Sequence, residues 1–218
     1  MSDWLTWQVV DSAFPTGAFA HSFGLESAWQ QGEVEDLDAL GRFLQGSVLQ
    51  AGHATLPLLN SAYQHPEHLV ALDELSDVFL VNAVANRASR IQGRALVATA
   101  ARIWPSEAMV ALRMLAQANC AHVAPWSGAT FRALGLPLAT AQRVALFGAA
   151  RAVLTSAVRL GITGSFEAQR MQHASAWWLE EVAERCGTLT ADDLAQTAPV
   201  IDILQAGHDR LYSRLFQS

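Results

Sequence analysis

The sequence contains no lysine, and arginine supplies all 14 of its Lys and Arg residues. A Schiff-base enzyme needs a lysine amine, and a Walker A loop needs a lysine directly after a glycine. The missing lysine therefore excludes both kinds of chemistry. We do not expect the chain itself to be a P-loop GTPase or ATPase.

Cysteine and charge are also scarce. The two cysteines, Cys120 and Cys186, cannot build a disulfide framework. Charged residues make up 16% of the chain and hydrophobic residues 51%. This composition predicts a substantial core and argues against disorder. It also predicts that another chain covers some of the apolar surface.

No long uncharged apolar run is present. The most apolar stretch, 138–160, is interrupted by Arg143, Arg151 and Arg159, whereas a membrane span needs about 20 mainly apolar residues. The chain opens Met-Ser-Asp-Trp, with an acid where a signal peptide carries a basic residue. We therefore expect a cytoplasmic protein that has no membrane partner.

The charges fall into three blocks. Residues 1–86 hold one Arg and eleven acids, residues 87–175 hold ten Arg and two acids, and residues 176–218 hold three Arg and seven acids. Blocks of opposite sign favour oriented contacts with charged protein partners. The net charge of −6 argues against nucleic acid as the partner of the basic block.

The sequence pattern is helical nearly throughout, because alanine is frequent and alternating β-branched runs are missing. It predicts one compact all-α domain over 1–218 with about ten helices. Proline and glycine over 123–137 predict irregular chain or only a short helix there. The expected helices cover 18–31, 36–51, 54–63, 73–104 with a break near Asn86, 108–120, 138–160, 166–185 and a turn capped by Thr190. Asp36 and Ser106 are expected to cap the helices that follow them.

The segment 14–26 reads FPTGAFAHSFGLE and contains the pair His21-Ser22. Neighbours in a helix point about 100° apart, and Glu26 would lie one turn from Ser22 rather than from His21. A catalytic triad needs its base in contact with its nucleophile and oriented by a third group. A small helical hydrolase using His21 and Ser22 is therefore an alternative that the spacing disfavours.

Two short motifs offer ligands for a transition metal. His65 and His68 are three residues apart, and Cys120 lies two residues before His122. Imidazole and thiolate suit borderline divalent ions, but neither spacing matches a closed zinc site. A stand-alone nickel-binding protein is the second alternative, with solvated surface histidines as the plainer interpretation.

Three arginines recur at helical spacing, with Arg87, Arg90 and Arg94 at positions i, i+3 and i+7. They are expected to share one face of a helix. Acids are scarce in the surrounding block, so their counter-charges must come from elsewhere in the fold or from a partner protein.

The C-terminal tail, 208–218, follows Gly207 and would form an amphipathic helix. Eleven residues are too few for a helix that is stable alone, so we expect the tail to be loosely held and to become ordered against a partner. Docking on its own domain is the alternative. The apolar stripe would consist of Leu211, Tyr212, Leu215 and Phe216, with Arg210 and Arg214 beside it.

Four stretches occur in an order that resembles the urease accessory protein F (UreF) family over nearly the whole chain. They are FPTGAFAHSFGLE at 14–26, NRASRIQGR at 86–94, GATFRALGL at 128–136 and YSRLFQS at 212–218. The chain departs from the family at 164–169, which reads GSFEAQ where members often read Gly-Gln-x-x-Gly-Gln.

The resemblance implies an all-α, non-catalytic urease maturation factor, often a homodimer, without a resident cofactor or assigned metal ligands. It implies binding to UreD (UreH), recruitment or regulation of the GTPase UreG, and nickel insertion into apo-urease. Gly24 would allow close helix packing, and the residues at 21, 22 and 26 would either satisfy buried polar groups or face the partner. The expected partner-binding residues are His21, Ser22, Glu26, Arg87, Arg90, Arg94, Arg210, Tyr212, Arg214, Leu215 and Phe216.

Overall fold

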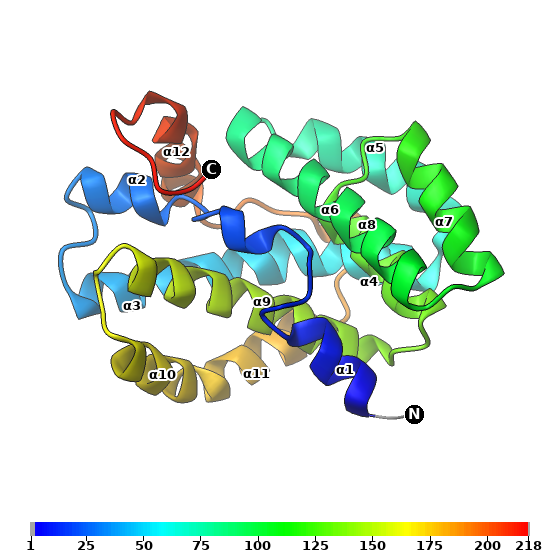
Figure 1. Ribbon diagram of the computed structural model, residues 1–218, viewed down its shortest axis with the longest axis horizontal. Coiled ribbons are helices and arrows are strands. Elements are labelled where there is room, and N and C mark those ends of the chain that lie inside the picture. The colour runs from blue at the N-terminus through cyan, green and yellow to red at the C-terminus, as the bar shows by residue number, and fades with distance from the viewer. Residues whose placement is uncertain (1–2, 218) are drawn as a thin grey trace.

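A computed structural model describes residues 3–217, and this part of the chain is helical with no strand (Figure 1). The all-α prediction is confirmed. Short 3-10 turns occur at Ala18–Ala20, Pro66–His68, Ala191–Asp193 and Gly207–Arg210, and a π turn at Ala51–Thr55 joins α3 to α4. The α-helices are α1 (Asp3–Val10), α2 (Leu25–Gln30), α3 (Leu37–Gln50), α4 (Leu56–Gln64), α5 (Leu69–Phe79), α6 (Ala83–Ile103), α7 (Glu107–Ala118), α8 (Val123–Ala133), α9 (Leu138–Arg159), α10 (Ser165–Ala174), α11 (Ala176–Cys186) and α12 (Pro199–Ala206).

Side-chain caps fix several helix starts. Asp36 accepts from the Ala39 amide at 2.7 Å at the start of α3, and Ser106 caps α7, both as the sequence predicts. Asn82 caps α6 through the amides of the first turn. The break expected near Asn86 therefore lies four residues earlier, at Asn82.

For the segment 123–137 the sequence predicts irregular chain or a short helix, and the structure has a helix of 11 residues there. This helix is α8, whose Pro125 sits in the first turn, where a proline costs no helical hydrogen bond. Gly128 lets α8 approach α4 so closely that a Cβ would lie 2.2 Å from the Leu59 carbonyl oxygen. Proline and glycine here serve helix entry and helix packing, respectively.

Two expected helices are interrupted. The helix over 166–185 is split at Ser175 into α10 and α11. The helix over 18–31 is broken between a 3-10 turn and α2, because Phe23 and Gly24 adopt positive φ angles of 54° and 89°. Spacing arguments that assume a continuous helix from 18 to 31 therefore do not hold.

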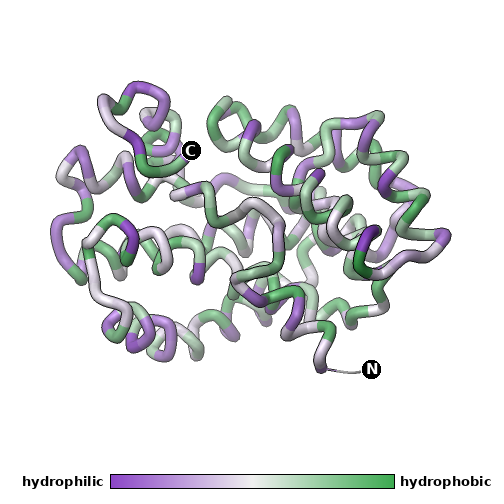
Figure 2. The backbone as a smooth tube through the Cα atoms, viewed as in Figure 1, coloured by the Kyte–Doolittle hydropathy of each residue, from purple (hydrophilic) through white to green (hydrophobic). Residues whose placement is uncertain are grey.

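The core joins two groups of helices. One cluster contains buried residues of α2, α3, α9 and α11, including Leu40 and Leu146. The other clusters lie around α4, α6 and α8, with the fully buried Trp126. Hydrophobic and hydrophilic positions alternate along the helices in Figure 2, as amphipathic packing requires. None of the described helices is long and apolar enough to cross a membrane.

Candidate functional site

The N-terminal segment 14–26 and the C-terminal segment 208–217 meet at one end of the molecule, beside α12 (Figure 1). The Gln217 amide donates to the Ala20 carbonyl at 2.8 Å. Gln30 on α2 donates to the Ser213 carbonyl at 3.0 Å. Two of the motifs that resemble the family therefore form one structural unit, although they lie at opposite ends of the sequence.

Gly24 allows this unit to form. Its φ of 89° is a left-handed conformation that favours glycine, and a Cβ there would lie 3.1 Å from the Cβ of Gln205 on α12. The expectation that Gly24 permits close helix packing is confirmed. The neighbouring Phe23 takes a positive φ without being glycine, so the chain turns sharply before α2.

Glu26 lies at the centre of the unit as a buried carboxylate. It accepts hydrogen bonds from His208 Nε2 at 3.0 Å, from the Leu215 amide at 2.6 Å and from the Phe216 amide at 3.2 Å. Both Glu26 and His208 are almost completely buried. A buried carboxylate is costly unless it is paired and hydrogen-bonded, so these three donors hold the tail onto the domain.

Aromatic and cationic groups close the same unit. The Arg159 guanidinium, at the end of α9, lies 4.1 Å from the ring centre of Phe216 and 4.2 Å from that of Phe19. It also donates to the Phe19 carbonyl. Such cation–π contacts contribute roughly 0.5–1 kcal/mol at exposed sites and more when buried. Phe216 is buried, so this residue anchors the tail.

The helix expected over 208–218 is not formed. A 3-10 turn, Gly207–Arg210, is followed by irregular chain to the last described residue. The four apolar residues do not form one stripe, because Phe216 is buried whereas Tyr212 and Leu215 are exposed. The contacts described above favour the alternative, in which the tail docks on its own domain, over a loosely held tail.

The outer surface of the tail carries charged side chains. Asp209 pairs with Arg87 on α6 at 2.7 Å and with Arg214 at 3.6 Å. The Arg87 hydrogen bonds lower the pKa of the Asp209 carboxyl. Arg210 and Tyr212 point away from the domain and are exposed. The tail thus continues the charged surface that begins on α6.

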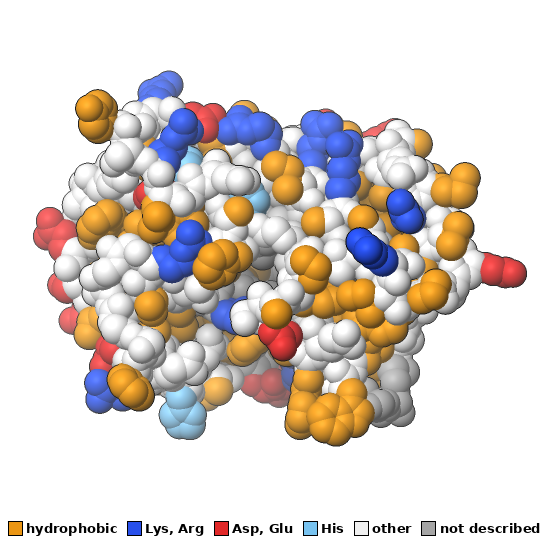
Figure 3. Space-filling view, viewed as in Figure 1, with side chains coloured by type: hydrophobic (Ala, Val, Ile, Leu, Met, Phe, Trp, Pro, Cys, Tyr) orange, Lys and Arg blue, Asp and Glu red, His pale blue; other side chains and the backbone are white. Residues whose placement is uncertain are grey.

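The arginine stripe lies on α6 as predicted. The tail supplies the acid for Arg87, and Arg94 donates to the Asn119 carbonyl at 3.2 Å. Within residues 3–217, neither Arg90 nor Arg94 has a carboxylate partner. Figure 3 shows the cationic side chains gathered along the upper part of one face, over α6 and the C-terminal segment.

His21 and Ser22 lie inside the molecule. Ser22 is fully buried, so a substrate carbonyl has no direct path to its hydroxyl. Burial, and to a lesser extent the nearby His208, lowers the pKa of His21 from its ordinary value of 6.5. The carboxylate of Glu26 binds His208, as described above. The geometry therefore favours the role of buried polar groups for His21, Ser22 and Glu26.

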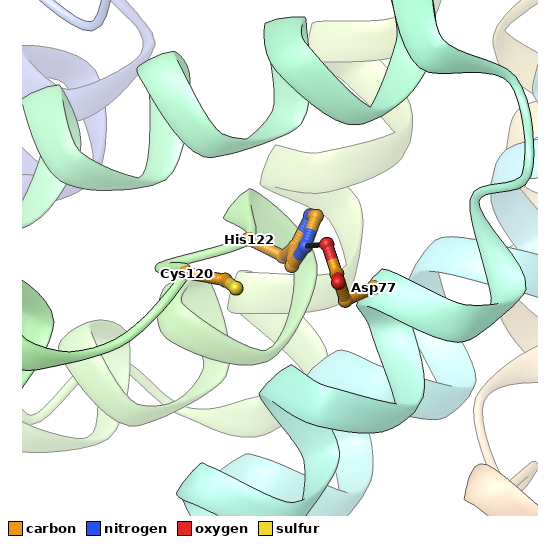
Figure 4. A group of neighbouring side chains, drawn as sticks. All are labelled: Asp77, Cys120 and His122. Carbon is orange, nitrogen blue, oxygen red and sulfur yellow. Dashed lines mark hydrogen bonds and ion pairs between the residues drawn. The ribbon is translucent and has the colours of Figure 1, made fainter.

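A second cluster lies where α5 ends and α8 begins (Figure 4). Asp77, Cys120 and His122 each present a ligand atom, and these atoms lie within 4.8 Å of one another. Burial raises the pKa of the Cys120 thiol, and hydrogen bonds from Asn86 and His122 lower the pKa of Asp77. His65 and His68 form a separate stacked pair, with ring centres 5.7 Å apart.

Comparison with known proteins identifies the family to which this sequence belongs. The family model for UreF matches residues 34–176, more than half of the chain. The chain belongs to the UreF family. The match covers the chain from α5 to α8, and therefore both the arginine stripe and the second cluster.

Relatives of this UreF-family chain align over nearly its full length. Urease accessory protein F of Arabidopsis thaliana is 38% identical over 221 residues, covering 99% of this chain and 92% of its own. Urease accessory protein F of Oryza sativa subsp. indica is 33% identical, with 98% and 84% covered. Urease accessory protein UreF of Arthrobacter sp. (strain FB24) is 30% identical, with 97% and 95% covered.

Sequence reasoning missed two residues of these clusters. His208 is the buried partner of Glu26, but it was considered only as the first residue of a tail. Asp77 lies four residues after Asp73 on α5, a spacing that places both carboxylates on one helix face. That spacing is the signal in the sequence that could have indicated a contact between α5 and another segment, here the loop that carries Cys120 and His122.

Proposed function

We propose that this chain is a non-catalytic urease maturation factor that binds UreD (UreH) and recruits or regulates the GTPase UreG for nickel insertion into apo-urease. Membership in the UreF family and relatives named as urease accessory proteins support the urease role. The partners UreD and UreG come from the sequence resemblance.

The observation that carries the proposal is a surface that spans α6 and the docked tail, which the Arg87–Asp209 pair joins (Figure 3). It combines Arg90 and Arg94 of α6, which have no carboxylate partner within residues 3–217, with Arg210, Tyr212 and Leu215 of the tail. We call it the stripe–tail surface. Guanidinium groups without local carboxylates suit an acidic protein partner, and exposed aromatic and aliphatic side chains supply apolar contact.

Below this surface, Glu26 and its three hydrogen-bond donors form what we call the clamp, which gives the tail a fixed conformation before a partner binds. Glu26 holds the backbone of Leu215 and Phe216, so the neighbouring exposed side chains start from defined positions. A preorganised surface avoids part of the ordering cost of binding. The clamp therefore supports partner binding without touching the partner.

A homodimer is also part of the proposal. Several large apolar side chains remain exposed in the described chain, among them Trp4, Trp7, Phe166 and Trp177. Exposed apolar groups of this size are typical of surfaces that another chain covers. Sedimentation of the purified protein measures this directly, and a monomer at micromolar concentration contradicts it.

Co-expression with UreD and UreG, followed by isolation of complexes, tests the proposal. We expect UreD to co-purify with this chain, and UreG to join when both are present. The purified chain alone should not hydrolyse GTP. Failure of UreD and UreG to co-purify in any combination would contradict the proposed function.

A further inference from the structure

We propose that Asp77, Cys120 and His122 form a binding site for one borderline divalent transition-metal ion, of the Ni²⁺, Co²⁺ and Zn²⁺ class. The ligand atoms lie within 4.8 Å of one another. A single tetrahedral ion, with bonds of about 2.0–2.3 Å, needs ligand atoms roughly 3–4 Å apart. The side chains of Cys120 and Asp77 are partly exposed, and they would rotate on binding to bring the ligand atoms to this separation.

The loop that carries Cys120 and His122 is held rigidly. The buried Asp73 accepts from the Ala121 amide at 2.8 Å and from the His122 amide at 2.7 Å. Ala121 itself takes a left-handed φ of 62°. The helix α6 touches this loop at Gly93, where a Cβ would lie 1.9 Å from the Ala121 carbonyl oxygen. The positions of two of the three ligands are therefore fixed before any metal binds.

His122 has the supporting hydrogen bond that a metal-binding imidazole needs. Its Nδ1 lies 3.1 Å from the Ser89 hydroxyl oxygen, which also accepts from the Val123 amide at 3.2 Å. Its Nε2 lies 3.1 Å from Asp77 Oδ1 and faces the cluster. A hydroxyl can donate to or accept from an imidazole nitrogen, so Ser89 supports either tautomer.

This freedom of Ser89 lets the ring change its role on binding. Without metal, Nε2–H donates to Asp77 and Nδ1 accepts from Ser89. With metal, Nε2 becomes a ligand, and the ring proton sits on Nδ1 and donates to Ser89. The thiol of Cys120 releases one proton to solvent as its sulfur binds the ion. Outer hydrogen bonds of this kind orient metal-binding histidines.

The donor set selects the class of ion. Thiolate and imidazole favour borderline and soft ions over Mg²⁺ and Ca²⁺, which prefer oxygen ligands. Three protein ligands leave one position of a tetrahedral site open. The site is accessible to solvent at Asp77 and Cys120. Its ion is therefore exchangeable and can accept a ligand from water or from another protein.

Two other groups in the chain could also bind added metal, and both lie apart from the proposed site. The exposed pair His65 and His68 lies apart from the cluster and is the obvious competitor for added metal. Cys186 is the second thiol and is buried in another part of the core. Both can be removed by substitution without touching the proposed site.

Titration of the full-length protein with Co²⁺ and Ni²⁺ tests the site. Cobalt bound by a thiolate gives a sulfur-to-metal charge-transfer band. We expect one ion per chain and this band in the wild type, in Cys186→Ala and in His65→Ala/His68→Ala. We expect Cys120→Ala to lose the band and Asp77→Ala to bind at least about 10-fold more weakly.

Circular dichroism confirms that each variant keeps its helix content, and His122 is not substituted because it is fully buried. The proposal is overturned if the wild type lacks the band, if the band persists in Cys120→Ala, or if it disappears in the His65/His68 variant. The measurement uses the isolated chain, so it is independent of the partner binding proposed above.

Discussion

Glu26 and His208 are 182 residues apart in the sequence, yet their side chains form a buried hydrogen bond of 3.0 Å. This contact ties the first turn of α2 to the tail. The same carboxylate accepts from two tail amides, so Glu26 alone supplies three of the hydrogen bonds that hold the tail on the domain.

Removing Glu26 should release the tail. Glu26→Ala leaves a buried imidazole and two amides without their acceptor, and breaking a buried pair in this way costs about 3–5 kcal/mol. We expect a lower free energy of unfolding and rapid proteolysis within 208–217. The exposed Glu33→Ala is the matched control. Equal protease resistance of the two variants would contradict the clamp.

The two aromatic residues of the tail should behave differently. Phe216 is buried between Arg159 and the domain, whereas Tyr212 is fully exposed. Phe216→Ala should cost about 3 kcal/mol, the lower end of the range for buried phenylalanine. Tyr212→Ala should change stability by less than about 0.5 kcal/mol. Chemical denaturation measures both values, and equal costs would show that the tail is not docked as described.

His21 should make the fold sensitive to acid. Because its pKa is lowered in the folded state, the unfolded state binds a proton more readily. Its contribution is present above the ordinary pKa of 6.5 and is lost as the pH falls below that value. One such group changes stability by at most about 1.4 kcal/mol per pH unit.

Denaturation at several pH values compares the wild type with His21→Gln. The variant can be less stable overall, but its stability should fall less steeply on acidification below pH 6.5. Parallel curves for the two proteins would show that His21 does not titrate in the way its burial implies.

Two helical glycines offer a matched pair of substitutions. Gly93→Ala forces a methyl group into the Ala121 carbonyl, so it should cost about 3 kcal/mol or more, at the top of the overpacking range. Gly148→Ala meets no atom within 4 Å and should stabilise α9 by about 0.5–1 kcal/mol. Thermal unfolding of both variants checks the close approach of α6 to the loop before α8.

The local sequence predicted much of the fold. Ser106 and Asp36 cap their helices because a cap depends only on nearby residues. The sequence left two possibilities open at α8, because Gly128 can break a helix or, as the structure shows, form a packing contact with α4. Whether a glycine ends a helix or admits a neighbour depends on the tertiary structure, which a single sequence does not display.

The candidate site could likewise be predicted from the sequence only in part. The stripe on α6 follows from helical spacing alone, and the structure places it on one helix. The docking of the tail does not follow, because it depends on one carboxylate at position 26 meeting the backbone of Leu215 and Phe216. Every residue except proline has a backbone N–H donor, so the residue types in the tail do not indicate that its amides bind Glu26.

The affinity of the purified chain for UreD tests the central claim most directly. The double variant Arg90→Glu/Arg94→Glu reverses two cations of the stripe–tail surface, and Arg42→Glu on α3 is an exposed control. We predict that the double variant binds at least about 10-fold more weakly, with unchanged helix content, whereas Arg42→Glu binds like the wild type. Equal affinity of all three proteins for UreD would contradict the assignment of this surface to partner binding.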